Sequence, residues 1–519
     1  MKNSKVLLTV LLTFSLALSI SAKEVFYNVL DYGARGDGKT NNTKAINAAI
    51  VAAAKNGGGT VYFPAGNFLS FTIRMKSKIT LHLDQGAVLI GDKEVNGIGY
   101  DLPEEDAWYK KFQDFGHSYW QNSLIYGDSL RDISITGNGM IWGKGLYTYD
   151  QPDIKGSGNK AISLKNCFNV TIRDVSILHG GHFCILATGV DNLTIDNVRA
   201  DADRDAFDID CCKNVRVSNC NINAPTDDGL CLKSSFGLGY ARATENVTIT
   251  NCHVYGYDFG TMMDGTFKTE FKDENPNAKH SITGRLKLGT ESNGGFRNIA
   301  VSNCVFEHSR GICIETADGG LIEDLVFNNI TMRDVPDTPF FIRLNARMRG
   351  PEGTPVGVCR RITFSNINIF DVGGRPKFPE VGAGMVMGIP GHCIEDLTLN
   401  NIRIYYRAGA SKEAIDKEVP QNIDVYPDPY RWHSLPAYGM YFRYVKGLRV
   451  SDVVMRYLNR DERPAFVLDE VSDATFYNVD AQKGDGAPLF ILKNVTNFTA
   501  HQVNGVVDTK VGKVEKKEF

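Results

Sequence analysis

A short phrase, in which an Asn, Asp or similar residue is followed by alternating apolar residues, restricts the fold more than any other feature of this chain. Its copies start at residues 169, 192, 214, 246, 298, 324, 361, 396, 447, 473 and 497. The shortest intervals are 22 residues (192 to 214) and 23 residues (169 to 192), and the longer ones are this unit with an inserted loop. Self-similar short strands at this period indicate a solenoid.

Each copy fits a short β-strand followed by a tight corner. The first apolar pair alternates with polar residues, so its side chains point to one face of a strand. The Asn or Asp that follows tolerates the left-handed backbone that a corner requires. Neither the leucine pattern nor the helices of a leucine-rich horseshoe are visible. We therefore predict an all-β fold, a right-handed, single-stranded parallel β-helix, over residues 96–510.

Both ends of such a solenoid need a cover, because an end coil exposes core residues and an unpaired strand edge. The segment TNNTKAINAAIVAAAKNG, which starts at Thr40, has the Ala/Ile spacing of one amphipathic helix. We expect this helix to cap the first coils within residues 23–95. Residues 96–120 are expected to form a loop beside a groove, and the charged tail 511–519 is expected to be frayed.

The first residues predict export. Lys2 and Lys5 precede an apolar run from Val6 to Ile20 with small residues at its end, which is typical of a cleaved signal peptide over residues 1–22. This run is shorter than a membrane anchor needs, and no later segment could span a bilayer. The formal net charge of −3 gives no reason to expect a nucleic-acid partner. We expect a periplasmic or secreted monomer.

Eleven Cys in an exported chain suggest disulfides, but the number is odd. Cys220, Cys252 and Cys304 occupy the same place in similar phrases, which predicts a stack of buried thiols rather than bridges. The adjacent pair Cys211 and Cys212 is the one candidate for redox or metal chemistry, and the spacing of a zinc site is absent. We expect no cofactor and no metal.

Two groups of carboxylates stand close together in the sequence. Asp residues occupy positions 201, 203, 205, 208 and 210, and Asp227-Asp228 follows one coil later. Because 23 residues separate Asp205 from Asp228, the two should lie on adjacent rungs, about 4.8 Å apart along the stack. This arrangement suits general acid–base chemistry, but it does not decide between inverting and retaining geometry. The alternative is a set of solvated turn residues or a calcium site.

With the repeat and these acidic groups, the chain resembles the polygalacturonases and their relatives, family 28 of the glycoside hydrolases. NVLDYGARGDGKTNNTKAINAAI is similar to the entry segment of pectin-acting β-helix enzymes, and GTESNGGFRNIAVSNCVF to the stretch that follows the family's catalytic-site histidine. RDAFDID resembles the phrase N-T-D-x-x-D, and TDDGLCLKSS resembles D-D-x-x-x-x-K-S, whose lysine corresponds to Lys233. We therefore expect Lys233 to contact the substrate. The resemblance implies that Asp227 protonates the leaving oxygen, that Asp205 and Asp228 activate water, and that configuration inverts.

Two features of the family pattern are missing. Gly284 stands where the family has its histidine, and Cys313 and Glu315 stand where it has the arginine and lysine that hold a galacturonate. A glutamate at that place would repel a uronate, which argues against plain homogalacturonan as the substrate. Arg285 and Lys287 lie two apart and therefore on one strand face, so they could replace the missing basic residues as substrate contacts. Lys287 and Glu315, on adjacent rungs, form either an altered substrate clamp or a structural ion pair.

Other basic side chains are candidates for sugar contacts. His182, one coil before the first acidic group, and His280, in a long insertion, could each take the place of the missing histidine. Arg343, with Arg347 and Arg349 nearby, could contact an acidic sugar, and the alternative is a solvated loop.

These observations predict an exported hydrolase that cleaves a pectic polysaccharide or oligosaccharide, with rhamnogalacturonan or another branched structure favoured over homogalacturonan. Insertions at 264–284 and 405–440 could close one end of the groove and make the enzyme exo-acting. One alternative is a β-helix polysaccharide lyase, which would need calcium and a basic proton abstractor. Another is a non-catalytic glycan-binding solenoid, which the presence of all three aspartates disfavours.

Overall fold

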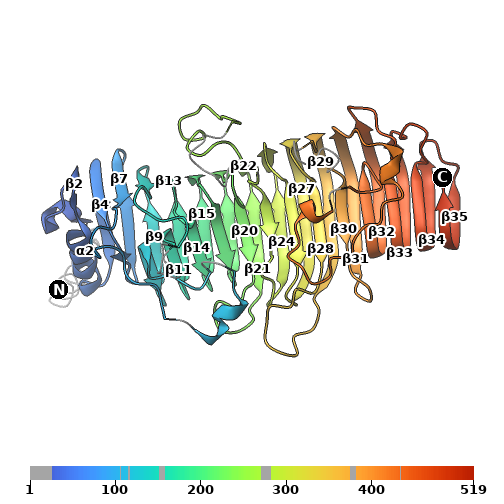
Figure 1. The fold of residues 1–519 in the computed structure, drawn as a ribbon. Coiled ribbons are helices and arrows are strands. Elements are labelled where there is room, and N and C mark those ends of the chain that lie inside the picture. Colours follow the sequence, from blue (N-terminus) through green and yellow to red (C-terminus); the bar gives the residue numbers. More distant parts are fainter. Residues whose placement is uncertain are drawn as a thin grey trace, which may run out of the picture.

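The chain forms one elongated stack of coils. The computed structural model describes residues 26–105, 107–114, 117–150, 158–270, 282–374, 382–432 and 434–519. The predicted signal peptide at 1–22 and His280 lie outside these residues. Helix α2 (Thr43–Lys55) lies at one end of the stack and strand β35 (Thr509–Glu518) at the other (Figure 1). Successive coils pair in parallel, which confirms the predicted parallel β-helix.

Three series of strands run along the stack, and each strand pairs with its equivalents one coil away. The first series is β5 (Ile73–Arg74), β8 (Ser123–Asp128), β11 (Lys160–Lys165), β14 (Phe183–Thr188), β17 (Asp205–Asp210), β20 (Leu230–Lys233), β23 (Leu286–Leu288), β26 (Ile312–Thr316), β28 (Phe340–Leu344) and β30 (Gly384–Met387). The second is β1 (Phe26–Asn28), β3 (Gly59–Phe63), β6 (Ile79–Leu83), β9 (Arg131–Thr136), β12 (Phe168–Arg173), β15 (Asp191–Asp196), β18 (Lys213–Ser218), β21 (Thr244–Thr250) and β24 (Phe296–Ser302). The third is β2 (Asp37–Asn41), β4 (Gly66–Ser70), β7 (Ala87–Gly91), β10 (Met140–Trp142), β13 (Ser176–Leu178), β16 (Arg199–Asp201), β19 (Asn221–Asn223), β22 (His253–Tyr255) and β25 (Val305–Glu307).

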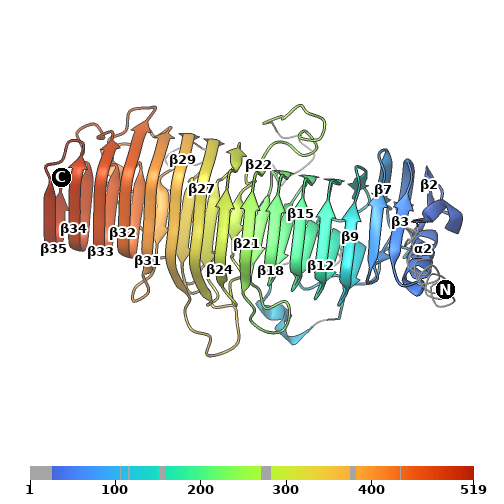
Figure 2. The same cartoon turned by 180° about the vertical axis from the view of Figure 1, so that it is seen from behind.

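Toward the C-terminal end the series merge into longer strands. The second and third series join in β27 (Leu321–Val335), β29 (Val358–Val372) and β31 (Ile394–Tyr406). All three series join in β32 (Met440–Tyr457), β33 (Phe466–Ala481) and β34 (Phe490–Val503). The first series and the loops that cross it face the viewer in Figure 1, and the second series faces the viewer in Figure 2.

Stacked asparagines hold one corner of the coil. Asn169, Asn192, Asn214, Asn246 and Asn298 all have left-handed backbones, with φ between 52° and 57°. From Asn192 onward, the side-chain amide of each donates to the side-chain carbonyl of the one before it, over 2.9–3.3 Å. The repeated Asn is therefore both the residue that tolerates the turn and a hydrogen-bonding ladder along the stack.

The interior of the stack is filled by aligned apolar side chains. Cys220, Cys252 and Cys304 are buried on successive coils, and each of the eleven cysteines, all within the described residues, is a free thiol. The predicted thiol stack is confirmed. Cys211 and Cys212 are also buried, and burial raises the pKa of both thiols, so neither favours the reactive thiolate.

The two ends of the stack are covered differently. As predicted, α2 packs Ile46, Ala49, Ile50 and Ala53 against the first coil. The prediction of a frayed tail was wrong, because β35 pairs antiparallel with β34 and so occupies the last strand edge. Val511 is the one buried side chain of this strand, and a single apolar residue among lysines and glutamates does not predict a strand.

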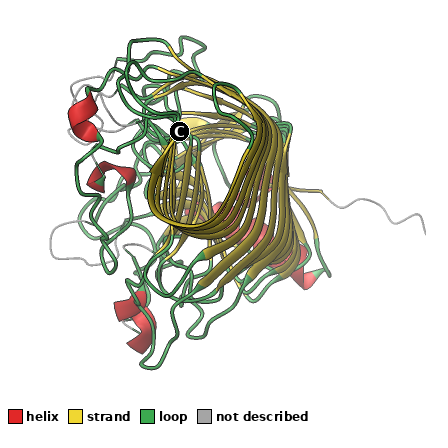
Figure 3. Ribbon diagram, turned by 90° about the vertical axis from the view of Figure 1, so that its right-hand side faces the viewer, coloured by secondary structure: helices red, strands yellow, loops and turns green. Residues whose placement is uncertain are grey.

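Loops gather on one side of the strand bundle in the view along its axis (Figure 3). A loop was predicted over residues 96–120, and the described part of residues 96–122 is a loop that carries the 3-10 helix η2 (Trp108–Phe112), where Trp108 packs against Phe236. Residues 407–439 carry the 3-10 helices η4 (Lys412–Ala414) and η5 (Pro429–Arg431) across β28 and β30. A further 3-10 helix, η1 (Val29–Tyr32), lies beside α2. Within the described residues, no helix is long and apolar enough to cross a membrane.

Candidate active site

Three carboxylates from adjacent coils meet on the side of the stack that the loops border. Asp205 is the first residue of β17, and Asp227 and Asp228 lie just before β20. The backbone N–H of Asp228 donates to Asp205 Oδ1 over 3.2 Å, and Ala206 N–H donates to the Asp228 carbonyl over 3.1 Å. One oxygen from each of the three carboxylates lies within 4.8 Å of the others. The structure therefore brings together the three aspartates singled out in the sequence.

Two cations fix the charge of Asp228. Arg285 Nε donates to Asp228 Oδ1 over 2.5 Å, and Lys287 Nζ lies 3.5 Å from Asp228 Oδ2. Both cations come from β23 and its preceding residue, one coil after Asp228. Burial alone would raise the pKa of this carboxyl, but Arg285 and Lys287 hold it well below its ordinary value. Asp228 is therefore ionised throughout the physiological range.

Asp227 and Asp205 are shifted in the opposite direction. Burial, followed by repulsion from Asp205, raises the pKa of Asp227 to about 7. Burial also raises the pKa of Asp205 to about 6, with the nearby Arg204 acting against the rise. The Asp227 side chain is 32% exposed, while Asp205 and Asp228 are buried, so Asp227 is the member that solvent reaches most easily.

Arg204 is a member of the site that sequence reasoning missed. Its Nε lies 3.3 Å from Asp227 Oδ2, and its guanidinium lies over the Phe183 ring. The residue occupies the place of the threonine in the family phrase N-T-D-x-x-D. Its position directly before Asp205 was the available signal.

His182 lies behind Arg204 rather than facing the carboxylates. It is buried, its Nδ1 is 2.6 Å from the Thr148 carbonyl oxygen, and its Nε2 is 2.5 Å from an Arg204 nitrogen. These contacts let His182 position Arg204.

Lys287 and Glu315 form a buried ion pair across adjacent coils, with 3.8 Å between Lys287 Nζ and Glu315 Oε2. Glu315 also accepts from the Thr290 hydroxyl over 2.5 Å and from the Cys313 thiol over 3.0 Å. Because Glu315 is wholly buried and satisfied, it does not present the exposed negative charge expected to repel a uronate. Of the two alternatives for this pair, the contacts fit the structural one.

A second buried network lies beside Asp205. Lys233 Nζ is 3.8 Å from Asp208, and the imidazole of His117 lies 3.7 Å from the same carboxylate. His117 also pairs with Glu291 over 2.7 Å, which raises the pKa of the imidazole to about 9 despite burial. His117 and Glu291 were missed because they come from the loop 96–122 and from a segment distant in sequence.

Arg343 is placed away from the carboxylates. Its guanidinium donates to the carbonyl oxygens of Gly388, over 2.8 Å, and Gln421, over 2.7 Å. The side chain is buried under the insertion 407–439, so the predicted contact with an acidic sugar does not match its surroundings. Its role in the structure is to hold that insertion against β28 and β30.

The same insertion reaches the cations beside Asp228. The hydroxyl of Tyr426 and Lys287 Nζ lie 2.9 Å apart, and Asp428 binds Arg310 over 2.6 Å. Arg285 is within 3.9 Å of Asp428. The sequence predicts that this insertion borders the groove. It does not predict that Tyr426 and Asp428 touch the site, because that depends on how the loop folds.

The backbone at position 284 explains why this chain has a glycine where the family has a histidine. Its φ is +48°, and an added Cβ would lie 2.0 Å from the Tyr255 carbonyl oxygen. Any side chain at this position would therefore force the backbone to move.

Two sets of side chains could place three metal ligands around one point. They are Asp205 with Asp227 and Asp228, and Asp205 with His117 and Asp208. Cationic side chains already contact both sets, so their negative charge is balanced without an ion.

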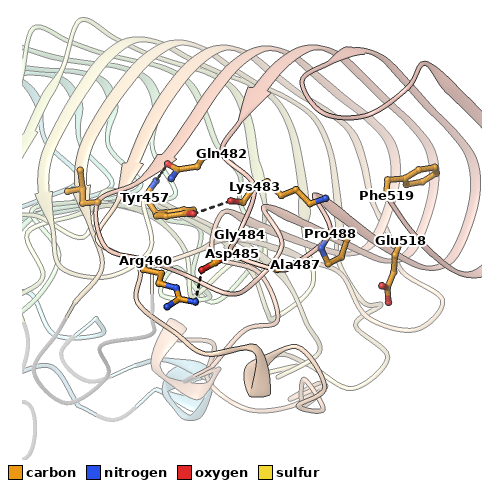
Figure 4. Close-up of a pocket in the computed structure, with 12 residues that line it drawn as sticks. Tyr457, Arg460, Gln482, Lys483, Gly484, Asp485, Ala487, Pro488, Glu518 and Phe519 are labelled. Carbon is orange, nitrogen blue, oxygen red and sulfur yellow. Dashed lines mark hydrogen bonds and ion pairs between the residues drawn. The ribbon is translucent and has the colours of Figure 1, made fainter.

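A separate depression lies at the C-terminal end of the stack (Figure 4). Tyr457 donates there to the Lys483 carbonyl oxygen, and Arg460 pairs with Asp485. None of the carboxylates described above lines it. It is distinct from the candidate active site.

A parallel β-helix with three clustered carboxylates on adjacent coils defines a pectate-lyase-like solenoid with an acidic site. The family described as rhamnogalacturonase A/epimerase, pectate lyase-like, matches residues 26–305, and the chain belongs to this family. The chain is 25% identical over 420 residues to a probable polygalacturonase of Vitis vinifera, covering 76% of this chain and 77% of that protein. It is 24% identical over 367 residues to an exopolygalacturonase of Arabidopsis thaliana, covering 67% and 73%. The resemblance to polygalacturonases is thereby confirmed.

A solved structure agrees with the fold. The crystal structure of a hyperthermoactive exopolygalacturonase from Thermotoga maritima matches with a TM-score of 0.57 and 18% identity, over 96% of this chain and 94% of that one. This likeness confirms the predicted right-handed β-helix.

Proposed function

We propose that this protein is a glycoside hydrolase that cleaves glycosidic bonds in a pectic polysaccharide or oligosaccharide. The observation that supports it most is the split in charge among three adjoining carboxylates, with Asp227 protonated near neutral pH beside an ionised Asp228. Glycoside hydrolysis needs one protonated carboxyl group as the acid and one ionised carboxylate as the base. The polygalacturonase names of the two relatives support a pectic substrate.

In the proposed reaction, Asp227 donates its proton to the glycosidic oxygen as the bond from that oxygen to the anomeric carbon breaks. A water molecule forms the new bond to the anomeric carbon, and its proton passes to Asp205. Asp205 is the stronger base of the remaining two because its pKa is raised, while the cations beside Asp228 weaken its basicity. Asp228 orients the water and balances the cations.

We propose inversion of configuration, as the family resemblance implies. The nearest oxygens of the three carboxylates lie within 4.8 Å of one another, closer than the roughly 6.5–9.5 Å between carboxyl groups that is usual for inversion. Retention would need a carboxylate free to attack the anomeric carbon. Asp228 is bound to two cations, so it does not fit that role. Proton NMR of the newly formed anomer decides between the two outcomes.

The substrate is proposed to be rhamnogalacturonan or another branched pectic structure. In place of the family's free basic clamp, Arg285 and Lys287 are bound to Asp228, Asp428, Tyr426 and Glu315. Cations engaged in this way have few donors left for a galacturonate carboxylate. Site recognition then has to use other contacts, which favours a sugar other than galacturonate beside the scissile bond.

We also propose exo-cleavage by an exported monomer. The insertion 407–439 contacts Lys287 and Arg285 through Tyr426 and Asp428, and we propose that it limits the substrate groove on the side of the later coils. The signal-like sequence at 1–22 supports a periplasmic or secreted location. Release of large fragments from the middle of a long polymer would contradict exo-cleavage.

Product analysis on a panel of pectic oligosaccharides tests the proposal. Incubation with homogalacturonan and rhamnogalacturonan oligosaccharides should give new reducing ends, mainly from the branched or rhamnose-containing members. A Glu352→Gln variant, which changes an exposed side chain, serves as the active control. Formation of an unsaturated sugar, seen by its ultraviolet absorbance, would show a lyase instead. Binding without any product would show a glycan-binding solenoid.

A further inference from the structure

A cavity of about 380 Å³ lies one corner away from the catalytic carboxylates, in the direction of the earlier coils. It is lined by Trp142, Lys144, Leu178, His179, Phe259, Gly260 and Asp264. The third-series strands β10 and β13 end at this cavity, and β16, which leads into the catalytic residues, is their next neighbour in register. Its volume falls within the range of small-ligand sites and is sufficient for one sugar ring.

The insertion after β22 forms the outer wall, and a buried carboxylate holds it there. Asp201 accepts from the backbone N–H of Gly260 over 3.0 Å and of Met263 over 3.1 Å. Asp201 is fully buried at the end of β16. Asp201, which is not one of the three catalytic aspartates, therefore anchors the segment that brings Phe259 and Asp264 to the cavity.

The lining suits an uncharged pyranose. Leu178 and Phe259 supply apolar surface for the C–H face of a sugar. Lys144, whose ammonium lies over the Trp142 ring, and Asp264 supply polar groups for its hydroxyls. Acids accompany the bases here, because His179 Nδ1 is 3.3 Å from Asp203 and Asp264 lines the same cavity as Lys144. A uronate carboxylate would meet acids as well as bases there, so it gains nothing over a neutral sugar.

The cavity wall is linked to the catalytic residues through the backbone. Asp203, which pairs with His179, directly precedes Arg204 and Asp205. The Asp203 carbonyl oxygen accepts from the hydroxyl of Thr226, the residue before Asp227. A ligand that contacts His179 therefore lies next to the turn that carries Asp205, the proposed base, and Arg204, which pairs with the proposed acid Asp227.

We infer that this cavity is an accessory subsite for one neutral pyranose unit of the substrate, such as a branch sugar beside the cleaved residue. The inference rests on the proposed function and names the kind of pectic structure that the enzyme selects. A linear galacturonan has no neutral unit to place there, whereas a branched or rhamnose-containing chain does.

Direct binding tests the subsite without requiring turnover. Saturation-transfer NMR is recorded on the full chain carrying Asp227→Asn, with methyl β-D-galactopyranoside, methyl α-L-rhamnopyranoside and methyl α-D-galactopyranosiduronate as separate probes. At least one neutral probe should bind with a Kd on the order of millimolar, and Phe259→Ala and Lys144→Ala should each weaken it by about tenfold. Tyr477→Ala, which removes an exposed aromatic ring on a distant coil, should leave the Kd unchanged.

Three results would overturn the subsite. They are no binding of either neutral probe, equal binding by the Phe259→Ala and Lys144→Ala proteins, and tighter binding of the uronate than of both neutral sugars. Matching circular dichroism and unfolding curves show that the variants are folded. Because this readout does not depend on hydrolysis, a failure of the proposed function on the oligosaccharide panel remains a separate result.

Discussion

Asp227 and Asp228 are neighbours in the chain, yet their surroundings drive their pKa values apart. Asp228 has Arg285 and Lys287 against it, while Asp227 is raised by burial and by Asp205. Arg285 and Lys287 reach Asp228 because β23 pairs with β20 one coil later. The division into acid and ionised partner is therefore a property of the coil stack, not of the two residues alone.

The first prediction is that Asp227→Asn stabilises the fold at high pH. Unfolded Asp227 ionises near its ordinary pKa of 3.8, but folded Asp227 keeps its proton to about pH 7. The wild-type protein therefore loses stability relative to the variant as pH rises from about 4 to about 7. Above pH 7 the variant should be more stable by roughly 1 kcal/mol, measured by urea unfolding. If the unfolding free energies of the variant and the wild type differed by the same amount at pH 5 and at pH 8, the raised pKa of Asp227 would be contradicted.

The second prediction concerns the buried pair of Lys287 and Glu315. Lys287→Met leaves the carboxylates of Asp228 and Glu315 short of a cation, so it should cost roughly 3–5 kcal/mol of unfolding free energy. Adding Glu315→Gln should recover part of that loss, since it removes one of the unpaired charges. A double variant less stable than Lys287→Met alone would mean that the two side chains do not interact.

Sequence reasoning at this scale found the carboxylates but few of their partners. Asp205, Asp227 and Asp228 lie within one coil period of each other, so their meeting could be predicted from residue numbers. His117 reaches the site from a loop without a repeat. Its position depends on how residues 96–122 cross several coils, and no local pattern specifies that.

At the scale of elements, β35 gives the clearest difference between expectation and structure. The segment is rich in lysine and glutamate, yet it pairs with β34 from Ile491 to Ala500 and stacks Phe519 on Phe498. Charged side chains on an outer edge strand are a known protection against sheet-to-sheet association. A charge-rich sequence is thus compatible with a terminal strand as well as with a frayed tail.

The third prediction follows from this cap. Removing residues 509–519 exposes the edge of β34 and the apolar surface beneath Val511 and Phe519, so it should lower the unfolding free energy by roughly 2 kcal/mol or more and promote aggregation. Light scattering on heating provides the measurement. Lys510→Ala, an exposed change within the same strand, should behave as the wild type. Unchanged scattering by the truncated protein would show that β35 does not protect the edge.

At the scale of the whole molecule, the fold was predictable because it is a repetition. The Asn corners, the alternating strands and the thiol stack each recur, so one correct interpretation applies to every coil. The insertions occur once each. Contacts such as Tyr426 with Lys287 therefore had no second copy from which to be recognised.

The fourth prediction is that the stack holds together without disulfides. All eleven cysteines are free, so a reducing agent should leave the thermal midpoint unchanged. Titration with a thiol reagent in guanidinium should count eleven thiols without prior reduction. A lower count, restored by reduction, would reveal bridges.

The dependence of kcat/KM on pH tests the central claim most directly. With Asp227 as the acid and Asp205 as the base, activity on a cleaved pectic oligosaccharide should peak between about pH 6 and about pH 7, falling on the acid side as Asp205 gains a proton and on the alkaline side as Asp227 loses one. Asp227→Asn should lower kcat by roughly 10²–10⁴-fold and abolish the alkaline limb. An alkaline limb that persists in Asp227→Asn, with activity near that of the wild type, would contradict the account.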